Sequence, residues 1–261
     1  MSDNTDNQKS EDIEKEEKPG EFFKTAVLAI FLALVIRTFL FEPFNIPSGS
    51  MLPTLQIGDY LFVSKTSYGY SRHSFPFGLA SFEGRVMEDK PQRGDVIVFK
   101  LPTNPSIDYI KRLIGMPGDK IQVKRGRLYI NGEMVEREPV GMKRISTREG
   151  GKQNMMEYIE TLPGGVMHTI YEESDSEPLD NTDVYVVPDG HYFMMGDNRD
   201  NSQDSRVTEL VGYVPEVNLV GRAEILFFSI DESASIYKPW TWFSAIRYGR
   251  IFDRIGPARQ G

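Results

Sequence analysis

The chain has 261 residues, a formal net charge of −8 and no cysteine. Without cysteine there is no disulfide bond, no thiolate metal site and no cysteine nucleophile. An acidic chain lacks the basic bias of nucleic-acid-binding proteins, so no nucleic acid is expected as a partner. The histidines His73, His168 and His191 do not have the spacing of metal ligands. We therefore expect neither a metal ion nor another cofactor.

Residues 1–20 are polar and acidic, a composition that predicts a disordered tail. The apolar run from Phe22 to Phe41 is long enough to cross the ~30 Å hydrocarbon core of a bilayer. The acidic segment before it and the lack of a small-residue cleavage site argue against a cleavable signal sequence. We expect one transmembrane anchor over residues 21–41, with a buried core helix as the alternative. Lysines precede the span and Arg37 closes it, which favours a cytoplasmic N-terminus and an exported C-terminal part.

Residues 42–232 are expected to be mainly β, as an antiparallel sheet or partly closed barrel, because short β-branched or aromatic runs alternate with turn signals. Asn131-Gly132 predicts a tight hairpin between Arg127 and Val135. The polar stretch 137–183 is interpreted as an inserted subdomain. The runs that predict strands are Tyr60–Val63, Val96–Phe99, Tyr109–Met116, Ile121–Val123, Leu128–Ile130, Val184–Val187, His191–Met195 and Ala223–Ile230.

Residues 233–261 are expected to form an amphipathic C-terminal tail. Between Trp240 and Ile255, large apolar side chains are mixed with Arg247, Arg250 and Arg254. This pattern fits an amphipathic helix that lies in a membrane interface. A helix that docks on the surface of the β domain is an equally good interpretation.

Two serines follow the anchor closely, in Pro47-Ser48-Gly49-Ser50-Met51. The small residues leave room for a substrate backbone, and glycine permits a tight turn. Two hydroxyl groups at this spacing could serve as a nucleophile and as a hydrogen-bond donor to a developing oxyanion. An ordinary loop is the alternative interpretation, because Ser-Gly-Ser is common in turns.

A lysine lies within an otherwise apolar predicted strand, at Lys111. It could act as a general base only when neutral, which requires its pKa to fall from about 10.4 by roughly two to three units. Burial among the neighbouring aromatic and aliphatic side chains could supply that fall. The alternative is that Lys111 and Arg112 are two solvated charges on a sheet edge.

A polar loop, 196–206, follows the apolar strand that ends at Met195. Its aspartates, Asp197, Asp200 and Asp204, suggest calcium, but Arg199 stands where a calcium loop needs an oxygen ligand. We therefore expect no metal in this loop. Our interpretation is that Asp197, Asp204 and Arg206 form ion pairs that fix the loop, and that Ser202 hydrogen-bonds a catalytic amine.

Taken in chain order, the anchor and these motifs closely resemble those of bacterial type I signal peptidases (leader peptidases). The motifs that carry the resemblance are Pro47-Ser48-Gly49-Ser50-Met51 with Pro53-Thr54-Leu55, Arg93-Gly94-Asp95-Val96, Tyr109-Ile110-Lys111-Arg112 with Gly115 and Pro117-Gly118-Asp119, and Gly196-Asp197-Asn198 to Asp204-Ser205-Arg206. The resemblance runs from the anchor to about Ile230.

The resemblance implies a Ser/Lys dyad, with Ser50 as nucleophile and Lys111 as general base, in a peptidase domain over 42–232. It further implies that Ser48 donates to the oxyanion beside the N–H of Ser50, and that Ser202 orients Lys111. The small pockets that accept Ala-X-Ala before the scissile bond would be shaped by Ile46, Pro47 and Ile110.

The resemblance also implies the partners and the location of the protein. The partners would be precursor proteins that carry signal peptides, together with membrane lipid. The location would be the bacterial inner (cytoplasmic) membrane, crossed once, with the catalytic domain on the periplasmic side.

Two other functions fit part of the pattern. Self-cleaving repressors use Ser/Lys chemistry, but they carry a DNA-binding domain where this chain has an acidic tail and an apolar span. A membrane-tethered β domain that binds exported proteins without cutting them is the second alternative. That alternative predicts that Ser50 and Lys111 are dispensable.

Overall fold

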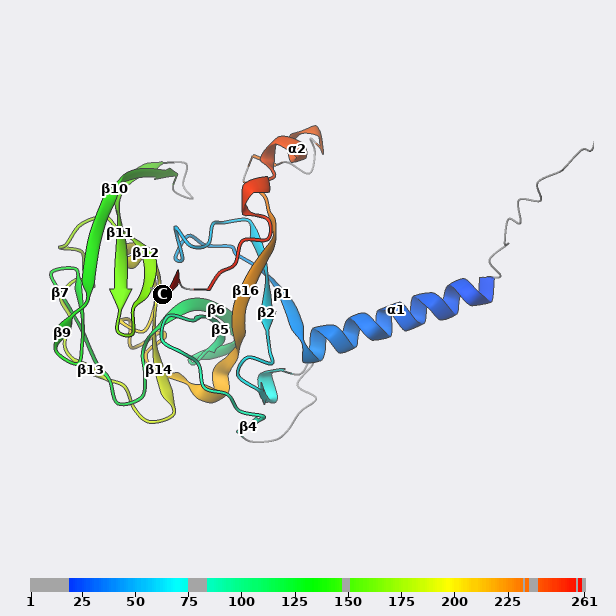
Figure 1. Ribbon diagram of the computed structural model, residues 1–261, viewed down its shortest axis with the longest axis horizontal. Coiled ribbons are helices and arrows are strands. Elements are labelled where there is room, and N and C mark those ends of the chain that lie inside the picture. Colours follow the sequence, from blue (N-terminus) through cyan, green and yellow to red (C-terminus); the bar gives the residue numbers. More distant parts are fainter. Residues whose placement is uncertain are drawn as a thin grey trace, which may run out of the picture.

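The computed structural model describes residues 19–74, 84–146, 151–231, 233–234, 239–256 and 258–259. The acidic tail expected over residues 1–20 therefore lies almost wholly outside the described residues, as do parts of the expected C-terminal tail. Within the described part, antiparallel strands dominate, and one long helix precedes them (Figure 1). The prediction of a mainly β, antiparallel fold with one N-terminal apolar helix is confirmed.

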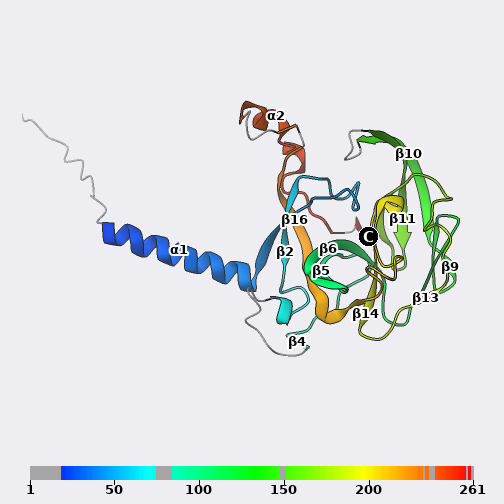
Figure 2. The same ribbon diagram turned by 180° about the vertical axis from the view of Figure 1, so that it is seen from behind.

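Helix α1, Pro19–Phe39, extends away from the β-rich part in both views of the molecule (Figures 1 and 2). Its segment Gly20–Phe39 has a mean hydropathy of 2.0 and none of it is buried, so it is long and apolar enough to cross a membrane. The helix ends two residues earlier than the expected 21–41, because strand β1, Phe41–Asn45, begins there and pairs with β2, Asp59–Ser64. Pro43 also disfavours a helical conformation for the residue before it.

The largest sheet has seven antiparallel strands in the order β1-β2-β16-β5-β6-β14-β15. It positions both residues of the expected dyad, because the Ser48–Ser50 turn follows β1 and Lys111 lies in β6. The remaining strands of this sheet are β5 (Val96–Leu101), β6 (Asn104–Gly115), β14 (His191–Met195), β15 (Val214–Pro215) and β16 (Leu219–Ser229).

A second sheet, of order β10-β11-β12-β17, lies on the side of the molecule away from α1 (Figures 1 and 2). A third, of order β13-β7-β8-β9, contains the hairpin predicted at Asn131-Gly132, where both residues have positive φ, 55° and 86°. The strands of these two sheets are β7 (Lys120–Lys124), β8 (Arg127–Ile130), β9 (Glu133–Met134), β10 (Glu136–Ser146), β11 (Lys152–Leu162), β12 (Val166–Glu172), β13 (Tyr185–Val186) and β17 (Ala258–Arg259).

Short elements fill the connections. The strands β3 (Tyr70–Ser71) and β4 (Arg85–Val86) pair with each other, and the single-turn helices are η1 (Arg72–Ser74), η3 (Arg199–Asn201), η4 (Glu216–Asn218), η5 (Pro239–Thr241) and η6 (Tyr248–Arg250).

The core beneath the Ser48–Ser50 turn is apolar and fully buried. Met51 and Leu55, which follow the turn, have no exposed surface and pack with Ile46 and with residues of β2, β5 and β16. Burying side chains of this size contributes about 1.5–3 kcal/mol each, so the backbone on both sides of Ser50 is held firmly. The turn therefore rests on the main sheet.

The continuous amphipathic helix expected between Trp240 and Ile255 is wrong. The chain forms only the four-residue helix α2, Trp242–Ala245, between η5 and η6. Ile246 is extended, with φ −68° and ψ 124°, and Phe252 has φ 72°, so neither continues a helix. The arginines hold the segment against β2 instead, because Arg250 forms an ion pair with the buried Asp59 at 2.5 Å.

Candidate active site

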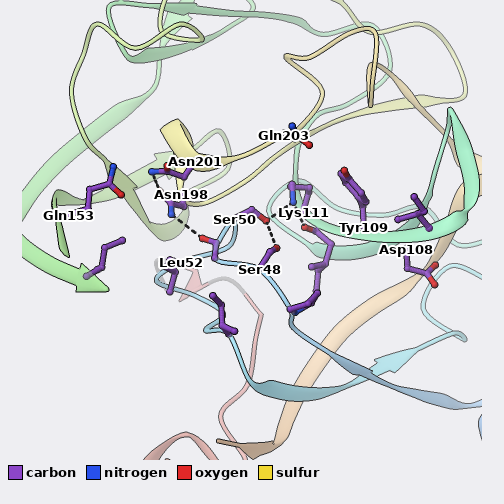
Figure 3. Close-up of a pocket in the computed structure, with 16 residues that line it drawn as sticks. Ser48, Ser50, Leu52, Asp108, Tyr109, Lys111, Gln153, Asn198, Asn201 and Gln203 are labelled. Carbon is purple, nitrogen blue, oxygen red and sulfur yellow. Dashed lines mark hydrogen bonds between the residues drawn. The ribbon is translucent and has the colours of Figure 1, made fainter. Parts of the chain in front are cut away.

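The structure brings Ser50 and Lys111 together, 61 residues apart in sequence. The Nζ of Lys111 lies 2.7 Å from the Oγ of Ser50 and also donates to the carbonyl of Ile110 at 2.9 Å (Figure 3). Lys111 is only 4% exposed, and within the described residues its amine has no carboxylate in ion-pair contact. A hydroxyl within hydrogen-bond reach of a buried amine is the geometry of a nucleophile and its base.

Burial lowers the pKa of Lys111 from 10.5 to about 8. The buried carboxylates of Asp204 and Asp197 act in the opposite direction, because negative charge favours the ammonium form. The effect of desolvation on the pKa is the larger one, so part of the Lys111 population is neutral near pH 7. The alternative of two solvated charges at a sheet edge does not fit, since Lys111 and Arg112 are both buried.

The serine turn is held through its backbone by the loop that follows β14. The carbonyl of Ser50 accepts a hydrogen bond from the N–H of Asn198 at 3.1 Å, and the carbonyl of Gly49 accepts one from the side-chain amide of Asn198 at 3.0 Å. A Cβ at Gly196 would lie 2.5 Å from the carbonyl oxygen of Ser50, so only glycine permits this approach. The contacts with Asn198 thus set how Ser50 presents its hydroxyl and its N–H.

The two supporting serines differ in what they contact. The Oγ of Ser48 lies 3.5 Å from the Oγ of Ser50, at the limit of a hydrogen bond, and Ser48 is exposed to the cavity (Figure 3). Ser202 is buried beside Gly196, but its hydroxyl has no hydrogen-bond partner among the residues that the structure describes. The hydrogen bond expected between Ser202 and Lys111 is therefore not formed here, and the role of Ser202 stays a prediction.

The ion pairs of the loop are arranged differently from the expectation. Asp204 pairs with Arg206 at 2.9 Å and accepts the N–H of Gly196 at 3.0 Å, as a loop-fixing pair should. Asp197 pairs with Arg112, not Arg206, through two bonds of 2.6 and 2.8 Å. Burial alone would raise the pKa of either aspartate, but the adjacent guanidinium holds each below its usual range.

Arg112 is a site residue that the strand pattern did not reveal. Alternation along β6 places it on the face opposite Lys111, where a solvated charge was one interpretation. That face is covered by the 196–206 loop and the chain after Ser50, so Arg112 is buried and also donates to the carbonyl of Gly94 at 2.8 Å. Thr54 completes the contact by donating to Asp197 at 2.5 Å.

A buried charge network continues from this loop into the second sheet. Arg199 forms a two-point ion pair with Glu160 of β11, with one bond at 2.9 Å, and His168 of β12 lies 3.3 Å from the same carboxylate. Glu160 and His168 are cross-strand partners. Burial would raise the pKa of Glu160, but Arg199 outweighs burial and the pKa is lowered. Burial also lowers the pKa of His168. The second sheet therefore supports the loop that holds Ser50.

A cavity of about 530 Å³ opens in front of the dyad. Pro47 and Ile110, both expected to bind substrate, line it, and so do Asp108 and Tyr109 (Figure 3). Ile46 does not line the cavity: it is 3% exposed and packs into the core beneath the turn. Its position differs from the expectation because the strand alternation after β1 turns its side chain inward.

No group of three or more histidine, cysteine, aspartate or glutamate side chains suited to a metal ion occurs in the described part of the chain. The hydroxyls of Ser48 and Ser50 and the amine of Lys111 line the cavity. An acyl transfer fits these groups, because they supply a nucleophile, a base and a donor beside them.

The chain is similar to several known proteins. The family model described as "Signal peptidase, peptidase S26" matches residues 20–228. Signal peptidase I of Rickettsia typhi is 39% identical over 97% of this chain and 98% of its own length, and that of Rickettsia prowazekii is 40% identical over the same shares. A crystal structure of a signal peptidase I from Enterococcus faecalis is 30% identical, covers 51% of this chain and 97% of its own, and has a TM-score of 0.30. This chain therefore belongs to the signal peptidase family, peptidase S26.

Proposed function

We propose that this protein is a membrane-anchored serine endopeptidase that removes signal peptides from exported precursor proteins by means of the Ser50–Lys111 dyad. The observation that carries the proposal is the 2.7 Å contact between the Ser50 hydroxyl and an amine whose pKa burial lowers to about 8. Membership of the signal peptidase family supports the reaction and the class of substrate.

The chemistry follows from the protonation state of Lys111. The neutral amine takes the proton of Ser50 as the Oγ attacks the scissile carbonyl carbon, and a tetrahedral intermediate forms. The N–H of Ser50 and the hydroxyl of Ser48 donate to its oxyanion. The ammonium of Lys111 then protonates the departing amine as the C–N bond breaks. Water, deprotonated by the same amine, hydrolyses the remaining ester to Ser50.

Cleavage after Ala-X-Ala is the specificity that we propose. Pro47 and Ile110 line the cavity beside the dyad, and we propose that they leave room for a small side chain before the scissile bond and exclude a bulky one. A single pocket of this kind discriminates by about 1–3 kcal/mol per added methylene. Two alanine positions, recognised together, multiply that selectivity.

The anchor places enzyme and substrate in one membrane. Helix α1 is long and apolar enough to span a bilayer, and a tethered precursor then meets the enzyme at a raised effective concentration. We propose that the protein crosses the bacterial inner membrane once, with a cytoplasmic N-terminus and a periplasmic catalytic domain. The chain has no cysteine, so a single Ser→Cys substitution on the exposed surface, labelled in intact cells, reports the side directly.

The specificity is tested with three precursor peptides and the full-length protein in detergent. One peptide ends its signal in Ala-X-Ala, and in the other two either alanine is replaced by leucine. We expect the first to be cut after its second alanine at least 100-fold more efficiently (kcat/KM) than either leucine peptide, which corresponds to about 3 kcal/mol. Equal cleavage of the three would contradict the assigned pocket. Binding without any cleavage would favour the tethered, non-enzymatic β domain.

A further inference from the structure

The cavity in front of the dyad has two chemically distinct halves. On one side of Ser50 lie Tyr109 and Asp108 of β6, and on the other lie Asn198, Asn201 and Gln153 (Figure 3). The side chain of Gln203 lines the same cavity from the 196–206 loop. Figure 3 places Gln203 near Lys111, so the amides of the half away from β6 are those of Asn198, Asn201 and Gln153.

The second sheet contributes part of that half. Ile145 of β10 and Gln153 of β11 are cross-strand partners, and both line the cavity although they are far from Ser50 in sequence. The side-chain amide N–H of Gln153 donates to the carboxylate of Glu173, which leaves the amide carbonyl oxygen of Gln153 to accept a hydrogen bond. The β10–β11 hairpin thus contributes a polar acceptor to the wall of the cavity.

An extended peptide that passes the nucleophile must occupy both halves, since each residue advances it by about 3.3 Å. The half beside β6, to which Ile110 belongs, takes the residues before the scissile bond in the function proposed above. The amide-rich half then faces the residues after it. An amide carries both a donor and an acceptor, and the groups that every peptide offers are backbone N–H and C=O.

We propose that Gln153 of the β10–β11 hairpin binds the backbone of the mature segment, the part of the precursor that follows the cut. This inference rests on the proposed function and adds a second substrate-binding region to it. Recognition through the backbone is independent of sequence, as it must be for an enzyme whose substrates differ after the signal peptide. It also gives the second sheet a role in binding substrate.

The test uses two peptides with the same Ala-X-Ala signal end. The long peptide continues for six residues after the cut, and the short one ends one residue after it. We expect the full-length parent to cut the long peptide about tenfold more efficiently, as measured by kcat/KM. The variant Gln153→Ala should lose about fivefold on the long peptide, the effect of one hydrogen bond, mainly through KM. On the short peptide it should stay within twofold of the parent.

Asn154→Ala is the matched control, because Asn154 is exposed, adjacent to Gln153 in β11 and on the opposite face of the strand. It should leave both peptides unaffected. An equal loss on long and short peptides in Gln153→Ala would overturn the inference, and so would a parent that cuts the two peptides equally well. A parent that cuts neither peptide would refute the proposed function, and the inference with it.

Discussion

Raising the pH from 6 to 10 should activate the enzyme through one group, the amine of Lys111. Burial lowers the pKa of this amine to about 8, against the opposing effect of the nearby aspartates. Only the neutral form can accept the proton of Ser50, so kcat/KM should rise with pH and level off above the pKa. The direction is unambiguous, because loss of the proton creates the active base.

The size of the change follows from the pKa. With a pKa of about 8, roughly one tenth of the amine is neutral at pH 7 and roughly one hundredth at pH 6. A solvated lysine would be neutral in only about one molecule in 3000 at pH 7. Burial therefore increases the active fraction at pH 7 by about 300-fold, and kcat/KM should fall about tenfold per pH unit below the midpoint.

The assay is cleavage of a precursor peptide by the full-length protein, followed at low substrate concentration so that kcat/KM is measured directly. Lys111→Arg serves as the control, since a guanidinium stays charged throughout this range and cannot act as the base. It should be inactive at every pH. A flat profile from pH 6 to 10, or a midpoint near 10.5, would refute the assignment of Lys111 as a buried general base.

Four further predictions concern other contacts. Below pH 8, Lys111→Met should have a higher free energy of unfolding than the parent. Between pH 8 and 10.5 the free energy of unfolding of the parent should rise by about 3 kcal/mol, because its lysine is neutral in the folded chain and protonated in the unfolded chain; urea unfolding at several pH values tests this. Ser48→Ala should lower kcat about 100- to 1000-fold with little change in KM; an unchanged kcat would exclude Ser48 from the oxyanion site. Arg112→Met should lower the free energy of unfolding by about 3–5 kcal/mol, because Asp197 is left buried and without its ion-pair partner. Denaturant titration measures this loss, and a loss below about 1 kcal/mol would contradict the prediction. Trp240→Ser with Trp242→Ser should weaken vesicle binding by a chain that begins after the anchor, since Trp240 is 70% exposed; unchanged binding would remove the tail from the membrane interface.

The sequence predicted the parts of the molecule that depend on local pattern and on motif order. The strand runs, the Asn131-Gly132 hairpin and the apolar helix are local, and the structure contains them. Ser50 and Lys111 lie in motifs whose order resembles the family, so their approach was expected although 61 residues separate them.

The remaining features depend on how distant strands meet. Arg112 is buried because the 196–206 loop covers its face of β6, and no property of its neighbours in sequence reports that cover. Glu160 and His168 meet only through the register of β11 with β12. The tail likewise departs from the expected helix where it meets a distant strand, because Arg250 pairs with Asp59 of β2.

The most direct test of the Ser/Lys account is to locate the cut by mass spectrometry, using a precursor with an Ala-X-Ala signal end. The parent, Ser50→Ala and Lys111→Ala are compared as full-length proteins in lipid. We predict a single cut after the second alanine by the parent and none by either variant, with all three folded and membrane-bound. Cleavage at the same bond by Ser50→Ala would contradict the account, because the nucleophile would then lie elsewhere.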